Sequence, residues 1–173
     1  MLSERIESLL NEQVNKELFS SYLYLSMSAY MSEINMNGYA NWFRVQAQEE
    51  KDHAMIIYNY IISAGGRVKL KAIEEPQVEF DGIKNVLELT LEHERFVTSS
   101  IYKIYEVAME ERDYKTVRAM DWFINEQVEE EDNATDNIAK YDMFSSDPKA
   151  LYLLDQELGA RVYTTPPQLT GQA

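Results

Sequence analysis

Two residues one helical turn apart, Glu50 and His53, have the types and spacing to do chemistry together. Side chains three positions apart lie on the same face of a helix. The rest of that face is apolar and includes Tyr39, Phe43 and Ile57. An ionised group on a core-facing stripe costs several kcal/mol unless it is paired or bound to a cation. The pair therefore indicates that something cationic lies against this helix.

The polar positions of this stretch belong to a set that occurs twice in the chain. Four segments each carry such residues on an otherwise apolar face: Glu17 on the first, Glu50 and His53 on the second, Glu94 on the third, Gln127 and Glu130 on the fourth. Glu17 precedes Glu50 by 33 residues and His53 by 36. Glu94 precedes Gln127 and Glu130 by the same two intervals. Di-iron carboxylate bundles use one Glu from each of two helices and Glu-x-x-His from each of the other two. The repeat predicts a dinuclear metal site in which Gln127-x-x-Glu130 replaces the second motif and Glu50 is placed to bridge.

The donor atoms of this set limit the choice of metal. Four carboxylates and one imidazole would neutralise two divalent cations. Hard oxygen ligands with few nitrogens and no sulfur favour iron or manganese, and zinc is able to compete. A second acidic group could hold a third cation beside the pair: Glu49, Glu126, Glu129 and Glu130.

Helical periodicity indicates the elements that must position these residues. It predicts four long helices and one short one, at about 3–34, 39–64, 82–111, 113–143 and 147–159, in a single domain spanning 1–173. Ser3 and Asp147 are candidate N-caps, and Pro148 fits the first position of the last helix. The stretch 67–81 is too long for a turn and predicts a crossover, whereas the tail 164–173 is expected to be irregular. The predicted fold is an all-α four-helix bundle with its long crossover between the second and third helices.

Composition narrows the possible partners. Sixteen Lys and Arg against thirty Asp and Glu give a net charge of −14, which argues against nucleic-acid or anionic-membrane binding and favours cations. The chain has no cysteine, so thiolate zinc sites, iron–sulfur clusters and cysteine nucleophiles are excluded. No signal peptide is visible, and the most apolar short run, 55–64, is too short to span a bilayer. A cytoplasmic location is the default expectation.

With these residues the chain resembles the non-haem ferritins of bacteria and archaea over nearly its whole length. Two stretches carry the resemblance most specifically: Asn41-Trp42-Phe43 followed by Gln48-Glu49-Glu50-x-x-His53, and the run Trp122 to Glu131. The resemblance implies a ferritin-like fold with a short fifth helix and an iron-storage protein with ferroxidase activity. Such a protein oxidises Fe²⁺ with O₂ or peroxide and keeps Fe³⁺ as mineral inside a hollow homo-oligomeric cage, a 24-mer in this family.

The resemblance also implies roles for individual residues. One iron would be held by Glu17, Glu50 and His53, and the other by Glu50, Glu94 and Glu130, with Gln127 in the outer shell. Tyr24 would hydrogen-bond or donate electrons next to the pair. A third iron would use Glu49, Glu126, Glu129 and Glu130. Bacterioferritins, by comparison, have an intact second Glu-x-x-His and a haem-ligating Met where this chain has Asp52, so haem is not expected.

Two other interpretations stay open at this point. A non-storage di-metal oxidase acting on an organic substrate would use the same ligands without a cage, and a structural or signalling bundle would use no metal. A second apolar line on the first helix bears on the choice, because it predicts contact with a neighbouring subunit: Val14, Leu18, Tyr22 and Leu25.

Overall fold

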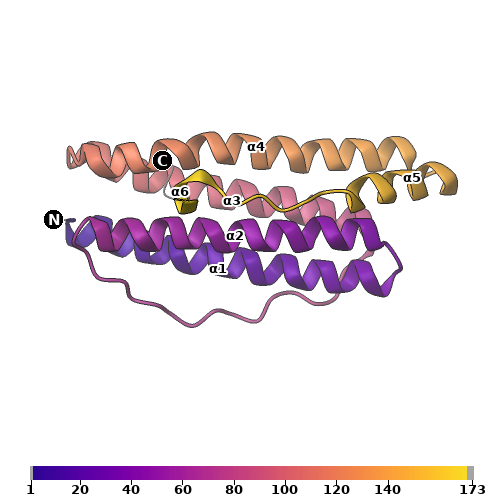
Figure 1. Cartoon of the computed structure of the whole chain (residues 1–173), viewed down its shortest axis with the longest axis horizontal. Helices are drawn as coiled ribbons and strands as arrows, with labels where there is room; N and C mark the ends of the chain where they lie inside the picture. The colour runs from indigo at the N-terminus through magenta and orange to yellow at the C-terminus, as the bar shows by residue number, and fades with distance from the viewer. Residues whose placement is uncertain (1, 171–173) are drawn as a thin grey trace.

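The computed structural model describes residues 2–170. Within that range the chain forms six helices: α1 (Glu4–Glu33), α2 (Asn37–Ser63), α3 (Gly82–Glu110), α4 (Tyr114–Phe144), α5 (Pro148–Gly159) and α6 (Pro167–Thr170). The four long helices lie side by side (Figure 1). The α1–α2 and α3–α4 hairpins form the main contacts, and α5 packs across the ends of α2 and α4. The predicted four-helix bundle with a short fifth helix is confirmed.

The helix boundaries follow local chemistry. Each of the five predicted helices begins and ends within two residues of its expected position. The Ser3 hydroxyl accepts a hydrogen bond from the Ile6 amide at 3.1 Å, and Asp147 caps α5 by accepting one from the Lys149 amide at 2.9 Å. Both predicted N-caps are thus confirmed, as is Pro148 at the start of α5.

The tail differs from the sequence-based expectation. Residues 164–166 are irregular, as expected, but Pro167–Thr170 forms the short helix α6. Proline is compatible with the first position of a helix because the amide hydrogen it lacks would have no intrahelical partner there. The rest of the expected irregular tail, residues 171–173, lies outside the described residues.

The crossover between α2 and α3 runs along the bundle beside α1 (Figure 1). Its backbone is bound by side chains of α1 near both ends. Near the start, the Arg67 amide donates to Glu7 and the Arg67 carbonyl accepts from Asn11, both at 3.0 Å. At its far end, the Gly82 amide donates to the Tyr30 hydroxyl at 2.9 Å. These contacts confirm the crossover and fix the second hairpin against the first.

The core consists of two apolar clusters with a polar layer between them. One cluster contains Tyr24, Phe43 and Leu87, and the other contains Leu10, Ile57 and Ile101. On each of the first three helices, residues of the two clusters flank the predicted polar position along the helix. The apolar clusters therefore fix the long helices in register and bring the polar positions to one level of the bundle.

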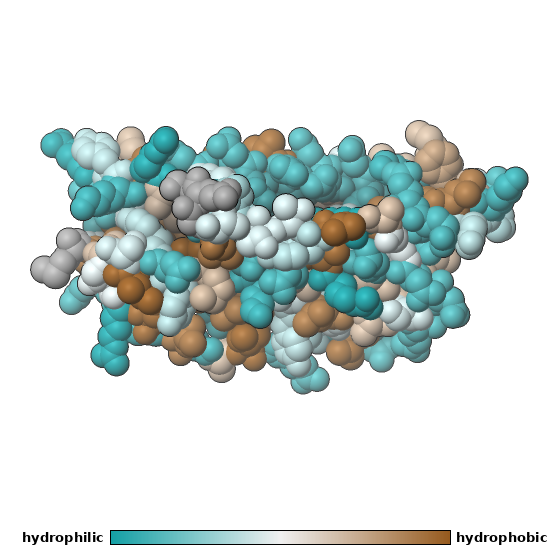
Figure 2. Space-filling model, viewed as in Figure 1, coloured by the Kyte–Doolittle hydropathy of each residue, from teal (hydrophilic) through white to brown (hydrophobic). Residues whose placement is uncertain are grey.

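Apolar side chains also reach the surface. The second apolar line of α1 changes along its length: Val14 is buried, whereas Tyr22 and Leu25 are 50% and 47% exposed. In the view of Figure 2, apolar residues gather in the half of the molecule that holds α1, α2 and the crossover. Among residues 2–170, no helix combines the length and the apolar character needed to cross a membrane.

Candidate metal centre

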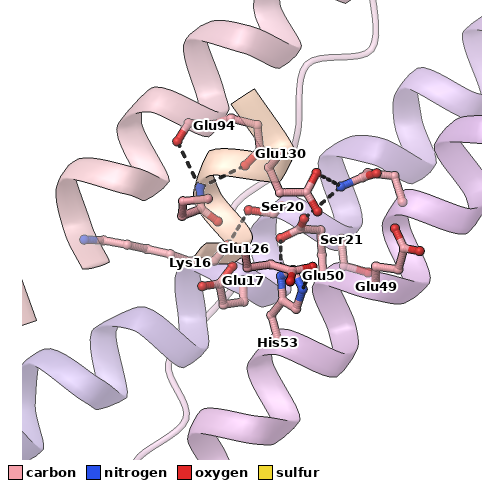
Figure 3. A network of polar contacts seen from close by, with 12 residues as sticks. Lys16, Glu17, Ser20, Ser21, Glu49, Glu50, His53, Glu94, Glu126 and Glu130 are labelled. Atoms are coloured by element: carbon pink, nitrogen blue, oxygen red, sulfur yellow. Dashed lines mark hydrogen bonds and ion pairs between the residues drawn. The ribbon is translucent and has the colours of Figure 1, made fainter. Parts of the chain in front are cut away.

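The polar layer contains two groups of possible ligands that share one residue. Oxygen or nitrogen atoms of Glu17, Glu50 and His53 lie within 4.8 Å of one another, and so do carboxylate oxygens of Glu50, Glu94 and Glu130. Figure 3 shows these side chains converging from the four long helices. Because Glu50 belongs to both groups, its two oxygens are placed between two possible metal positions.

Burial controls the protonation of the four carboxyl groups. Glu17, Glu50 and Glu94 are each 1% exposed, and Glu130 is 5% exposed. Loss of solvent raises the pKa of Glu17 and, with repulsion from Glu94, raises that of Glu50 well above its usual range. It raises the pKa of Glu94 to about 7 and that of Glu130 to about 8. A cation between these groups would replace the protons that the carboxyls otherwise retain near neutral pH.

Burial and neighbouring charges act in opposite directions on the pKa of His53. Burial by itself lowers the pKa of this imidazole, but the Glu50 charge and hydrogen bonding to Glu126 raise it well above its usual range. Its Nδ1 lies 3.7 Å from Glu50, and its Nε2 lies 3.6 Å from Glu126. Edge-on contacts with the rings of Trp122 and Phe123 hold it in place. The imidazole therefore has a carboxylate on each side.

Tyr24 and Gln127 contact the same carboxylate of this layer. The Tyr24 hydroxyl donates a hydrogen bond to Glu94, and the Gln127 amide donates to the other Glu94 oxygen at 3.3 Å. Burial and the Glu94 charge raise the pKa of Tyr24 well above its usual value, so the phenol keeps its proton. Both residues thus orient Glu94 from outside the two ligand groups.

Two glutamines orient the carboxylates in ways the sequence analysis did not assign. Gln13 donates to Glu17 at 2.8 Å, and Gln46 donates to Glu130 at 2.6 Å and to Glu50 at 3.3 Å. Each glutamine precedes a ligand on its own helix by four positions, so the two side chains share a face. That repeated spacing is a sequence signal that could have identified them.

The residues predicted for a third metal are only partly brought together. Glu126 and Glu130 lie with His53 in a third group, whose ligand atoms are within 4.8 Å of one another. Glu129 is exposed. Glu49 is paired instead with Arg161, a residue from beyond α5 that sequence analysis did not connect with the site.

One orphaned atom shows that the layer suits a cation. Glu17 Oε2 is buried and has no hydrogen-bond partner among the described residues. An unpaired buried carboxylate oxygen carries a large desolvation penalty, which a bound metal ion would remove. Fold and site together define a four-helix bundle with a buried carboxylate–histidine cluster whose composition is compatible with two metal ions.

Comparison with protein-family models shows which family of four-helix bundles the chain belongs to. The family model described as "Ferritin-like domain" matches residues 7–144. The chain therefore belongs to the ferritin family.

Individual relatives agree with this assignment. The chain is 37% identical to a bacterial non-heme ferritin of Staphylococcus aureus (strain USA300) over 94% of this chain and 98% of the relative. Among solved structures, it is similar to an engineered closed form of the Archaeoglobus fulgidus ferritin, with a TM-score of 0.93, 44% identity, and 95% of this chain and 100% of that chain covered. An open-pore ferritin from the same archaeon matches with a TM-score of 0.91 and 44% identity, covering 93% of this chain and 98% of that one.

The raised pKa values predict how stability depends on pH. Between the ordinary carboxyl pKa of 4.5 and the values of about 7 for Glu94 and about 8 for Glu130, the folded state binds more protons than the unfolded state. The unfolding free energy of the metal-free protein must therefore fall as the pH rises through this window. His53, with its raised pKa, adds a loss of the same sign above its ordinary value of 6.5.

Calorimetric melting of the metal-free protein at about pH 6, 7 and 8 measures this effect. The melting temperature should decrease with pH, and the double variant Glu94→Gln/Glu130→Gln should show a shallower decrease because neither side chain titrates. Saturating Zn²⁺ should also flatten the dependence, since metal-bound carboxylates are already ionised. A melting temperature that rises from pH 6 to pH 8 would contradict the assignment.

Proposed function

We propose that this protein stores iron and has ferroxidase activity, with Fe²⁺ as its substrate. The observation that carries the proposal is the pair of buried ligand groups that share Glu50. Belonging to the ferritin family and similarity to bacterial non-heme ferritins support the same conclusion. In this proposal, one Fe²⁺ is held by Glu17, Glu50 and His53, and a second by Glu50, Glu94 and Glu130.

The chain's own residues supply negative charge, ligand geometry and protons. The carboxyls would release their protons on binding Fe²⁺, and the two ligand groups that share Glu50 would hold two ions side by side for reaction with one oxidant molecule. Each Fe²⁺ loses one electron, and O₂ accepts two electrons and two protons to give H₂O₂. When peroxide is the oxidant, it accepts two electrons and two protons and is reduced to two water molecules. In this proposal Tyr24, whose hydroxyl donates a hydrogen bond to Glu94, hydrogen-bonds or donates electrons next to the pair.

The same proposal covers the outer-shell residue, the third iron, other metals and haem. Gln127 acts in the outer shell, and a third iron is bound by Glu49, Glu126, Glu129 and Glu130. Zinc or manganese would occupy the same oxygen-rich ligands. No haem is expected, because Asp52 stands where the bacterioferritin pattern has Met, and it accepts hydrogen bonds from Gln48 and Tyr163.

Storage requires an enclosed volume, which a single bundle does not provide. We propose a homo-oligomeric cage of 24 chains in the cytoplasm. The exposed part of the second apolar line of α1, at Tyr22 and Leu25, supports burial against another copy.

Size-exclusion chromatography with iron loading tests storage directly. The purified protein should elute as a particle of roughly half a megadalton, which is 24 copies of a 20.2 kDa chain. Aerobic addition of Fe²⁺ should place hundreds of irons in each particle. A small oligomer that binds two metals per chain and no more would instead favour a non-storage di-metal oxidase, and an absence of metal binding would favour a structural bundle.

A further inference from the structure

The segment after α5 returns along the bundle as a strap, defined here as residues 160–170. In Figure 1 it runs back from α5 between α2 and α4 and ends in α6, which contacts α2. Asn41 on α2 donates to the Arg161 carbonyl at 3.0 Å, and the Tyr163 hydroxyl donates to Asp52. The strap is therefore attached to the helix that carries Glu49, Glu50 and His53.

One strap side chain, Arg161, reaches the edge of the metal centre. Its guanidinium makes an ion pair with Glu49, donates to the Gln46 oxygen at 2.9 Å, and lies over the Trp42 ring at 4.6 Å from the ring centre. The side chain is only 22% exposed. The Trp42 ring, the Gln46 amide and the Glu49 carboxylate thus hold the guanidinium in a mostly buried position. Most arginines instead keep their head groups exposed to solvent.

The ion pair with Arg161 occupies the carboxylate of Glu49. The Glu49 side chain is 23% exposed and has the Arg161 guanidinium as its ion-pair partner. Glu49 is in none of the three groups of possible metal ligands found among the described residues. In Figure 3 its carboxylate points away from Glu17 and His53. The guanidinium supplies the positive charge that a metal ion would otherwise supply to Glu49.

We propose that Arg161 is a built-in competitor for the third metal site. In this arrangement the strap keeps Glu49 paired until a metal ion binds to Glu49, Glu126, Glu129 and Glu130 and displaces the guanidinium. The inference rests on the proposed function, because it assumes that metal ions bind in the polar layer. It assigns control of the third metal affinity to a residue more than a hundred positions away from Glu49 in the chain.

Gln46 connects this competitor to the dinuclear site. Its side-chain oxygen accepts from Arg161, and its amide nitrogen donates to Glu130 and Glu50. Arg161 therefore holds the amide in the orientation that presents its donor to the two carboxylates. Glu130 belongs to both proposed sites, so displacement of Arg161 removes one constraint on the residue they share.

Anaerobic calorimetric titration of the assembled, metal-free, full-length protein with Zn²⁺ measures the competition without redox chemistry. The wild type should bind two equivalents per chain tightly and a third more weakly. Arg161→Gln should bind the third equivalent on the order of tenfold more tightly, since no ion pair has to be broken. Arg161→Lys keeps the charge but loses the stacked, forked geometry, so its third affinity should lie between those of the wild type and Arg161→Gln.

Tryptophan fluorescence distinguishes displacement of Arg161 by metal from a purely structural role of Arg161, because only displacement would change the signal during the titration. The Trp42 emission should change with the third Zn²⁺ equivalent in the wild type, because the cation leaves its ring. Arg161→Gln should lack that change, and Trp42→Phe identifies which part of the signal is due to Trp42. Arg118→Gln is the matched control, because it removes the same charge from an exposed arginine on α4.

The outcomes separate this inference from the proposed function. If the wild type fails to bind the first two equivalents, the proposed function is wrong. If they bind but the third affinity in Arg161→Gln is unchanged or weaker, Arg161 does not compete and the strap proposal is overturned. Equal tightening in Arg161→Lys or in Arg118→Gln would also overturn it, because the effect would then come from packing or from net charge.

Discussion

Replacing Glu50 by Gln is expected to slow ferrous oxidation roughly 100-fold or more and to remove both tight metal equivalents. Glu50 is the residue shared by the two ligand groups, so its loss affects both positions at once. The amide has nearly the same size but lacks the negative charge that offsets two cations. Glu17→Gln should by comparison weaken mainly one equivalent, because Glu17 belongs to one group.

The same substitution should make the metal-free protein more stable at about pH 8. Burial raises the pKa of Glu50 well above its usual range, so ionising it inside the core is unfavourable. A neutral amide removes that cost. It also removes the Glu50 charge that raises the pKa of His53, so at about pH 8 the buried imidazole can lose its proton and leaves no unpaired charge behind. Loss of activity together with gain of stability would separate a metal ligand from a residue needed for folding.

Stopped-flow absorbance after mixing with Fe²⁺ measures the rate, and calorimetry measures the melting temperature. Glu88→Gln is the matched control, because it makes the same chemical change on an exposed position of α3. Rapid oxidation retained in Glu50→Gln would show that the metal centre is elsewhere.

Gly38→Ala is expected to destabilise the protein by about 3 kcal/mol or more through a steric clash. A Cβ atom at Gly38 would lie 1.6 Å from the Asp155 carbonyl oxygen of α5. Alanine is favoured over glycine within a helix by about 1 kcal/mol, but that gain is smaller than the cost of moving α5 away. The move would also break the hydrogen bond from the Tyr39 amide to the Asp155 carboxylate, which measures 3.0 Å.

Thermal unfolding of the metal-free protein tests this prediction, with Asn37→Ala as the control one position earlier. Asn37 is exposed, so its replacement should change the melting temperature little. Separation of α5 should also release the strap, so Gly38→Ala should lose the contact between Arg161 and Trp42. Wild-type stability in Gly38→Ala would mean that α5 does not pack so closely on α2.

Much of the architecture could be predicted from sequence because its signals are local. The capping groups Ser3 and Asp147, the turn at Asn35 and the glycines after α2 specify where helices begin and end. The tail was harder to interpret, since a four-residue helix is too short to produce a periodic pattern. Its place beside α2 depends on contacts with residues far away in the chain.

The ligand positions were also predictable, because 3.6-residue periodicity places Glu50 and His53 on one face and a repeated interval aligns Glu17 with Glu94. Gln13 and Gln46 had a similar signal, although the pattern does not say which carboxylate each amide contacts. Gln46 donates to Glu130 on another helix, and no spacing within α2 contains that information.

The sequence by itself determined the helices, their inward faces and the residues available to bind metal, because these depend on neighbours within a few turns. Only the tertiary structure decided which carboxylates share a position, how far burial shifts their pKa values, and that Arg161 pairs with Glu49. Those properties depend on distances between helices and on exclusion of water, which arise only when the bundle is packed.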